Sequence, residues 1–288
     1  MANEVAVISG KGGSGKTTVT SSFAAIAGDI VIVDCDVDAP DLHILLQPEA
    51  QVSEEFQASK VAVIDPDLCI ECGLCEENCR FDAAHPPEID SIACEGCSVC
   101  TLVCPEDAID MIPRISGHLY ESDTRLGRMV HAKLLPGEGN SGLLVTEVKK
   151  RAQRIAEETG TNKILIDGSP GIGCPVIATL TGVKVATVVT EPTMSGIHDM
   201  ERVVRLIRRF QSIPTVIVNK YDLNLKNTAR IEAFCKSEGI ELLGKIPFDS
   251  ITTRSMVDAT TLPEYSPQHE LVKLFEQMWD RISVLLSQ

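Results

Sequence analysis

The sequence predicts an α/β protein with a doubly wound, mainly parallel sheet, into which a small α+β domain is inserted. Three observations predict this fold. A glycine-rich loop joins the first apolar strand to the first helix, and eight cysteines in two runs of one spacing lie between residues 69 and 104. Elsewhere strand-like and helical runs alternate. The strands are expected near Val5, Ile30, Ile164, Val185, Val216 and Leu242.

The insertion is expected at residues 61–113, which leaves residues 1–60 and 114–288 as one discontinuous domain. With 44% hydrophobic residues, the 288-residue chain has enough apolar side chain for a core. A formal charge of −15 opposes nonspecific binding to nucleic acid or to an anionic membrane, since both need clustered Lys and Arg. No signal peptide and no bilayer-spanning apolar run are visible, so we expect a cytoplasmic protein.

The glycine-rich loop matches a phosphate-binding pattern. Residues 10–17 read G-x-x-x-x-G-K-T and lie between the strand Val5–Ile8 and a helical run that begins at Thr18. In such a loop backbone NH groups surround the phosphates, the lysine (Lys16) reaches the β- and γ-phosphates, and the hydroxyl of Thr17 binds magnesium. The predicted nucleotide contacts of this segment are Gly10, Lys11, Gly12, Gly13, Ser14, Gly15, Lys16, Thr17 and Thr18.

The eight cysteines repeat the spacing C-x2-C-x2-C-x3-C, which is that of bacterial two-cluster ferredoxins. In that arrangement the fourth cysteine of each run serves the cluster of the other run. An offset of 25 residues superposes the two runs and also pairs Asp82 with Asp107 and Ala83 with Ala108, as a duplicated fold would. One 4Fe-4S cluster is therefore predicted on Cys69, Cys72, Cys75 and Cys104. The other is predicted on Cys79, Cys94, Cys97 and Cys100.

Two other uses of the cysteines fit less well. Structural zinc sites use separated pairs or Cys/His sets, whereas here three cysteines at intervals of three, with a remote fourth, occur twice. A disulfide framework needs an oxidising compartment, and nothing in the sequence directs the chain to one.

The residues KGGSGKT at 11–17 resemble the deviant Walker A motif of the MinD/ParA/Mrp/nitrogenase-iron-protein ATPases. The whole chain is most similar to the MinD-like subgroup with an inserted two-cluster ferredoxin domain. The resemblance implies a P-loop NTPase sheet, Mg-dependent ATP hydrolysis and a homodimer with nucleotide at its interface, or a heterodimer with a homologous chain. It also implies that Lys11 acts in trans on the phosphates of the partner, as an arginine finger does.

Three further segments are similar to that family in the same order. By resemblance, Asp36 is the switch I aspartate that positions the attacking water and magnesium, with Asp34 and Asp38 as supporting candidates. Asp167 resembles the Walker B aspartate that holds magnesium through water. In addition, Gly171 is expected to present its backbone NH to the γ-phosphate, and Asn219 to contact the adenine base.

Cys174 follows the switch II segment and stands apart from the eight predicted cluster ligands. In the nitrogenase iron protein a cysteine past switch II ligates a cluster shared by two subunits, and in related ATPases such cysteines hold transferred metal. The resemblance therefore implies a candidate site for transferred metal at Cys174; the alternative is a small residue in a tight segment. Cys35 and Cys235 are expected in the core. The apolar stripe of Leu271, Leu274, Phe275, Met278, Ile282 and Leu285 is expected to pack on the sheet.

Three functions fit these observations. The first is an ATPase whose dimer closure assembles, carries or delivers an iron-sulfur or other metal cofactor to a client metalloprotein. The second is an ATP-gated donor of low-potential electrons to a redox partner, and the third is a positioning ATPase like MinD or ParA. A helix with Arg202, Arg205 and Arg209 on one face is either a solvated surface or a docking surface for an acidic domain.

Overall fold

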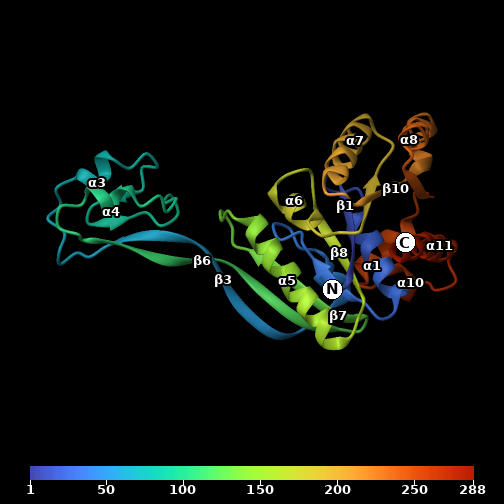
Figure 1. Ribbon diagram of the computed structural model, residues 1–288, viewed down its shortest axis with the longest axis horizontal. Coiled ribbons are helices and arrows are strands. Elements are labelled where there is room, and N and C mark those ends of the chain that lie inside the picture. Colours follow the sequence, from blue (N-terminus) through green and yellow to red (C-terminus); the bar gives the residue numbers. More distant parts are fainter. The chain divides into compact units, whose positions relative to one another are not determined.

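The computed structural model describes residues 1–288, and the chain divides into two compact units (Figure 1). The first, called the sheet unit, comprises Met1–Ser53, Leu119–Lys133 and Ser141–Gln288. The second, called the cysteine unit, comprises Glu54–His118 and Leu134–Asn140. Residues 61–113, the expected insertion, lie inside the cysteine unit.

The strands of the large sheet alternate with helices along the chain, as the sequence predicts. In sheet order they are β11 (Glu241–Ile246), β10 (Ile213–Asn219), β9 (Val185–Thr190), β1 (Asn3–Ser9), β8 (Lys163–Pro170), β2 (Val31–Asp34), β7 (Gly127–Leu134), β6 (Ile109–Thr124) and β3 (Glu49–Ile64). From β11 to β7 each neighbouring pair is parallel. All six expected strands are present, whereas β3, β6 and β7 were not predicted. The central strands are buried on both faces, which explains their continuous apolar sequences.

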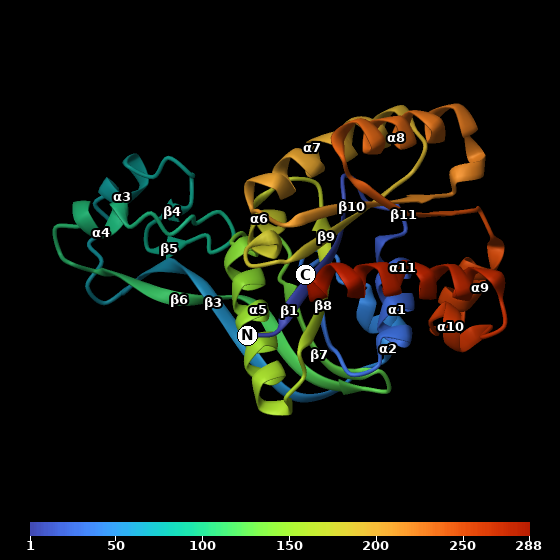
Figure 2. The same cartoon turned by 45° about the vertical axis from the view of Figure 1, so that its right-hand side comes forward.

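The helices are α1 (Lys16–Ala27), α2 (Leu42–Leu46), α3 (Leu74–Glu77), α4 (Val99–Val103), α5 (Ser141–Thr159), α6 (Cys174–Leu180), α7 (Met194–Arg209), α8 (Leu225–Glu238), α9 (Ser250–Val257), α10 (Leu262–Tyr265) and α11 (Glu270–Ser287), with a 3-10 turn at Tyr221–Leu223. Helices α7 and α8 lie on one face of the sheet, and α1 and α11 lie on the other (Figure 2). This two-sided cover is the doubly wound arrangement. None of the helices combines the length and the apolar composition that a membrane span requires.

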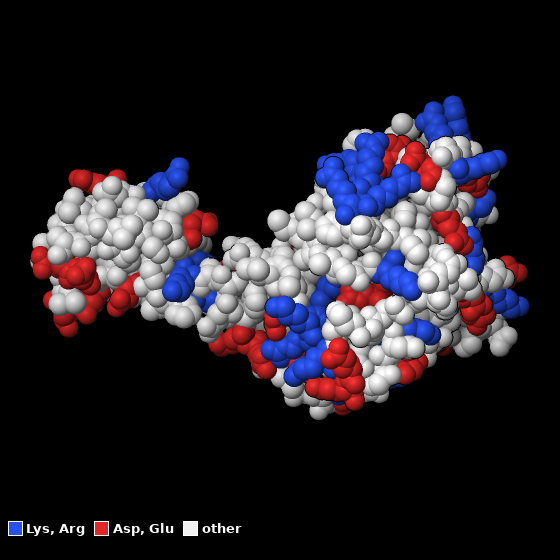
Figure 3. Space-filling view, in the orientation of Figure 1, with Lys and Arg blue, Asp and Glu red and all other residues white.

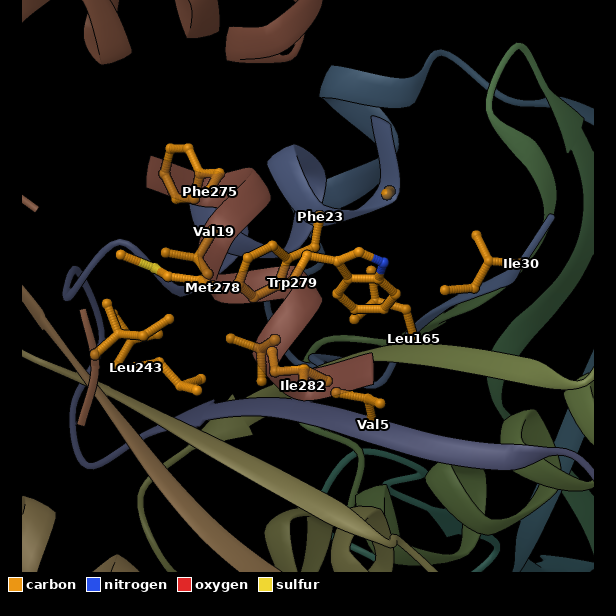
Figure 4. Packing of buried hydrophobic residues seen from close by; sticks show 14 of the residues in the cluster. Val5, Val19, Phe23, Ile30, Leu165, Leu243, Phe275, Met278, Trp279 and Ile282 are labelled. Atoms are coloured by element: carbon orange, nitrogen blue, oxygen red, sulfur yellow. The ribbon is translucent and has the colours of Figure 1, made fainter. Parts of the chain in front are cut away.

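The main core lies between α1, α11 and the sheet. Phe23 of α1 meets Phe275 edge to face with ring centroids 6.1 Å apart, and its ring lies 5.4 Å from that of Trp279 (Figure 4). Met278 and Ile282 are also buried in this cluster. The prediction that the C-terminal stripe packs on the sheet is therefore confirmed, and aromatic pairs of this geometry add to the apolar area buried there.

The cysteine unit contains α3, α4 and a two-stranded sheet of β4 (Ala84–His85) and β5 (Glu88–Ile89). Its backbone repeats at the offset of 25 residues that the sequence shows. Cys69 NH bonds Asp65 O and Cys94 NH bonds Asp90 O, each at 3.0 Å. Across the repeat, Asp65 NH bonds Ala108 O at 2.8 Å and Asp90 NH bonds Ala83 O at 2.7 Å.

Three pairs of left-handed residues recur at the same offset. Glu71 and Gly96 have φ of 53° and 66°, Gly73 and Ser98 have φ of 78° and 62°, and Asp82 and Asp107 have φ of 52° and 49°. A non-glycine residue rarely adopts positive φ, so matched outliers at matched positions mark two copies of one local fold. Sequence repetition therefore corresponds to structural duplication.

Candidate functional site

The first turn of α1 meets the end of β8 at a buried carboxylate. Gly15, with φ of 92°, ends the glycine-rich loop in a left-handed conformation and allows α1 to begin at Lys16. Lys16 Nζ lies 3.0 Å from Asp167 Oδ1. The hydroxyls of Thr17 and Thr20 donate hydrogen bonds of 2.8 and 2.9 Å to the same carboxylate. Asp167 is only 1% exposed, and these donors satisfy its charge.

Three carboxylates surround Lys16. Besides Asp167, Asp36 lies 3.4 Å away from Nζ, and Asp34 adds its charge from the end of β2. Burial alone would lower the pKa of Lys16, but attraction to Asp167, Asp36 and Asp34 outweighs it and raises that pKa to about 12. Lys16 therefore stays positively charged beside these carboxylates. Thr17, Asp36 and Asp167 carry oxygen atoms, which are the ligands that Mg²⁺ prefers.

The carboxylates at and after the end of β2 differ in their surroundings. Asp34 is fully buried and accepts hydrogen bonds from the backbone NH of Asp36 at 2.9 Å and of Leu42 at 3.2 Å. Burial and the negative charge of Asp167 raise the pKa of Asp34, and burial also raises that of Asp36. Asp38 is exposed. Asp34 thus holds the loop, whereas Asp36 faces Lys16.

A cavity of about 2030 Å³, its open mouth included, lies at this edge of the sheet. The predicted nucleotide-site residues that line it are Gly12, Gly13, Gly15, Lys16, Thr17, Thr18, Asp36 and Asn219. Sequence reasoning missed the far wall, which Phe248, Asp249, Thr252 and Met256 contribute. Their position directly after β11, at the carboxyl edge where open α/β sheets bind ligands, was the available signal.

Two predicted phosphate or base contacts have other partners in the structure. The Asn219 amide donates to Ser14 O at 2.8 Å, and its Oδ1 accepts from the backbone NH of Lys220 at 3.0 Å. The backbone NH of Gly171 donates to Ser9 O at 2.8 Å. Both residues therefore lie beside the glycine-rich loop, with their polar groups engaged within the chain.

Lys11 points toward the end of β9. Its Nζ lies 3.5 Å from Glu191 Oε2 and 3.5 Å from Thr193 Oγ1, and Lys220 shares Glu191 at 2.6 Å. Gly10, Lys11 and Ser14 line a small hollow of about 160 Å³ with Glu191. Lys11 is thus separate from the Lys16 cluster, at the outer side of the loop.

The eight cysteines of the cysteine unit surround two cavities that are open to solvent and similar in volume, their open mouths included. One, of about 330 Å³, is lined by Cys69, Cys72, Cys75 and Cys104. The other, of about 360 Å³, is lined by Cys79, Cys94, Cys97 and Cys100. No group of three or more His, Cys, Asp or Glu side chains is arranged to hold a single metal ion. Each cavity is lined by four cysteines, and four thiolates are the donor set that an iron-sulfur cluster uses.

Two backbone NH groups are directed at cysteine sulfurs in equivalent positions. Ala83 NH lies 3.3 Å from Cys79 Sγ, and Ala108 NH lies 3.3 Å from Cys104 Sγ. Partial burial disfavours the Cys79 thiolate, but amide hydrogen bonds, chiefly from Ala83, outweigh it and lower the pKa of the Cys79 thiol. Such bonds to sulfur favour the thiolate that binds iron and tune cluster potentials.

Cys174 is the first residue of α6 and is exposed, close to Gly142 at the start of α5. Cys35 and Cys235 are buried, so their predicted core positions are confirmed. Cys174 is therefore the one cysteine outside the cysteine unit whose thiol is open to solvent.

Lys and Arg gather over α7, the predicted arginine-rich helix (Figure 3). Arg202 lies 3.9 Å from Asp199, Arg205 lies 3.4 Å from Glu201, and Arg208 lies 2.5 Å from Glu238. Neighbouring acids thus offset much of this charge, which favours a solvated helix surface.

The fold and the Lys16 site define a P-loop nucleotide-binding protein of the α/β class. The model of the CobQ/CobB/MinD/ParA nucleotide binding domain matches residues 5–261, and the chain belongs to that family.

The chain is also similar in sequence to several relatives, and it shares its fold with solved structures. The chain is 36% identical over 224 residues to an uncharacterized protein of Methanocaldococcus jannaschii, covering 77% of this chain and 79% of that one. It is 24% identical over 268 residues to the iron-sulfur cluster carrier protein of Pyrococcus abyssi, covering 85% and 74%. The cell division ATPase MinD of Pyrococcus furiosus has the same fold, with a TM-score of 0.62, 20% identity and coverage of 99% and 100%.

Proposed function

We propose that the chain is a Mg-dependent ATPase whose nucleotide-driven dimer closure assembles, carries or delivers an iron-sulfur or other metal cofactor to a client protein. The observation that carries the proposal is the combination, in one chain, of the Lys16 nucleotide site with two cavities of four cysteines. The carrier name of the Pyrococcus relatives supports the same class of cargo.

Each residue of the nucleotide site has a role in this proposal. Lys16 binds the β- and γ-phosphates, and Thr17, Asp36 and Asp167 hold magnesium directly or through water. Asp36 also orients the attacking water. Gly171 and Asn219 would exchange their present partners, Ser9 and Ser14, for the γ-phosphate and the adenine base. Lys11 would leave Glu191 to reach the phosphates of a second copy.

The two cysteine sets that line the cavities would hold the predicted resident clusters. In each set the fourth ligand comes from the other run: Cys104 in one and Cys79 in the other. When bound, 4Fe-4S clusters supply one-electron transfer at low potential. Ala83 and Ala108 tune the sulfurs through their NH groups. Cys174, exposed and outside these sets, is the candidate ligand for transferred metal.

Hydrolysis by cluster-loaded protein tests the nucleotide part of the proposal. We expect Mg-dependent release of phosphate that Lys16→Ala reduces on the order of 100-fold, because the variant lacks the cation at the developing phosphate charge. A loaded wild-type chain that hydrolyses no ATP, or a Lys16→Ala chain of wild-type rate, would contradict it.

A second candidate function is an ATP-gated electron donor, and the paired cysteine sets favour it because two-cluster arrangements transfer electrons. Voltammetry with and without a nonhydrolysable ATP analogue separates the two functions. An unchanged potential, together with no ATP-dependent electron transfer, removes the donor.

A further inference from the structure

A short segment links the nucleotide site to the strands that enter the cysteine unit. Helix α2 follows the switch I loop and is followed, after Gln47 and Pro48, by β3. Strand β3 leaves the sheet unit after Ser53, and β6 returns to it at Leu119. The positions of β3 and β6 therefore depend on the positions of α2, which precedes β3, and of the β6–β7 turn, which follows β6.

The amino end of α2 is tied to the nucleotide site. The Asp34 carboxylate accepts hydrogen bonds from the backbone NH of Leu42, the first residue of α2, and from that of Asp36. Asp36 in turn lies 3.4 Å from Lys16. A change in the position of Asp36 on nucleotide binding thus acts on the start of α2.

The carboxyl end of α2 is held by Arg125, which lies in the two-residue turn between β6 and β7. Its Nη1 donates to Leu46 O at 2.8 Å and its Nη2 to Leu45 O at 2.7 Å, which satisfies two of the carbonyls that a helix end leaves free. The same guanidinium binds Glu264 through Nε at 2.6 Å and Nη2 at 2.8 Å. Lysine lacks the planar fork that these four bonds require.

A stack of rings provides a second contact between α2 and the hairpin. His43 of α2 lies parallel to His131 of β7, with centroids 6.1 Å apart, and Tyr120 of β6 stacks on His131 at 4.9 Å. Burial and the neighbouring His43 lower the pKa of His131 to about 4, so its ring is neutral at pH 7. The helix and hairpin are therefore packed together as well as hydrogen-bonded.

We infer that Arg125 is a positioning residue that transmits the nucleotide state from α2 to β3 and β6, and through them to the cysteine unit. The inference rests on the proposed nucleotide binding and deepens it, because it names the element that makes the cysteine unit respond. A displacement of α2 carries Arg125 and the β6–β7 turn with it, and shifts the start of β3 directly. Discrete contacts at both ends of one short helix are the kind of network that carries such coupling.

Hydrogen–deuterium exchange with and without Mg²⁺ and a nonhydrolysable ATP analogue tests the inference, because it reports local opening of each strand. Peptides from residues 10–18 report nucleotide binding, while peptides from residues 54–64 and 109–118 report the response of the strands. In the wild type we expect the analogue to change exchange of the strand peptides on the order of fivefold, the lower end of usual coupling. In Arg125→Gln we expect less than about a twofold change there, with protection of residues 10–18 retained.

Arg128→Gln is the matched control. Arg128 lies in the same hairpin, and its ion pair of 3.0 Å with Asp123 stays within that hairpin. We expect it to respond as the wild type does, and Arg125→Lys to respond as Arg125→Gln does. Thermal unfolding of each variant checks that the fold is kept.

Two results would overturn the inference and leave nucleotide binding intact. One is a strand response in Arg125→Gln that equals that of the wild type. The other is a wild type in which the analogue protects residues 10–18 but does not change exchange of the strand peptides. Absence of protection at residues 10–18 in the wild type would instead contradict the proposed function, and the inference with it.

Discussion

Cys79 belongs to the first cysteine run by sequence but lines the cavity of the second run. Replacing it therefore distinguishes ligand sets that cross between runs from sets confined to one run. The informative changes are Cys79→Ser alone, Cys79→Ser with Cys94→Ser, and Cys79→Ser with Cys69→Ser. Serine has nearly the shape of cysteine but lacks the soft thiolate that iron clusters need.

The iron content follows from the two cavities. A chain with two 4Fe-4S clusters holds about eight iron atoms, and Cys79→Ser should hold about four. Adding Cys94→Ser removes a second ligand of the same cavity, so about four should remain. Adding Cys69→Ser instead removes a ligand of the other cavity, so almost no iron should remain.

The assay is anaerobic reconstitution followed by iron and acid-labile sulfide analysis of soluble protein, with electron paramagnetic resonance after reduction. Cys174→Ser is the control: it should keep the about eight iron atoms of the two resident clusters and lose only metal bound for transfer, because Cys174 lines neither cavity. If each run bound its own cluster, the two double variants would exchange their results. That exchange would refute the crossed assignment.

Three further predictions concern the sheet unit. Catalysis in trans makes the ATPase rate per chain of the wild type rise with protein concentration, because a second copy must supply Lys11. Lys11→Ala should retain nucleotide binding but lose this rise, and a retained rise would exclude the trans role. Thr20→Val should lower the free energy of unfolding in urea by about 1.5–3 kcal/mol, because its buried hydroxyl bonds a carboxylate, whereas exposed Thr146→Val should change it by less than about 0.5. His131 has a folded pKa of about 4, below its ordinary 6.5. Its contribution to the free energy of unfolding is therefore fully present above pH 6.5 and is lost as the pH falls from 6.5 through 4, because over that range the unfolded chain binds a proton that the folded chain does not. Between pH 7 and 4.5 the wild type should therefore lose about 2 kcal/mol more than His131→Phe in urea unfolding, and equal losses would contradict a folded pKa of about 4.

Local patterns predicted much of the architecture and of the nucleotide site. The buried parallel strands are continuous apolar runs, and the glycine-rich loop joins a strand to a helix within a few residues, so neither depends on distant contacts. The cysteine spacing likewise repeats at a short offset, which the matched backbone of the cysteine unit preserves.

The features that sequence reasoning missed depend on distant partners. Strand β3 begins with a polar, mostly exposed run from Glu49, so no local periodicity of apolar residues predicts this strand. Its neighbour in the sheet, β6, lies beyond the cysteines in the chain. The bond from Asn219 to Ser14 and the pairing of Lys11 with Glu191 also join residues far apart in sequence. Motifs therefore predicted the residues that gather around Lys16, namely Thr17, Asp36 and Asp167, while the position of Lys11 and the partners of the other side chains required the fold.

We propose that ATP controls the release of an iron-sulfur or metal cofactor from this chain. The most direct test of this proposal is the rate of cluster transfer from anaerobically loaded protein to an apo acceptor protein, followed by circular dichroism with Mg-ATP, with Mg-ADP and without nucleotide. We predict transfer on the order of tenfold faster with Mg-ATP than with Mg-ADP, and loss of that difference in Lys16→Ala. Equal rates in all three conditions, from protein that hydrolyses ATP, would contradict the account.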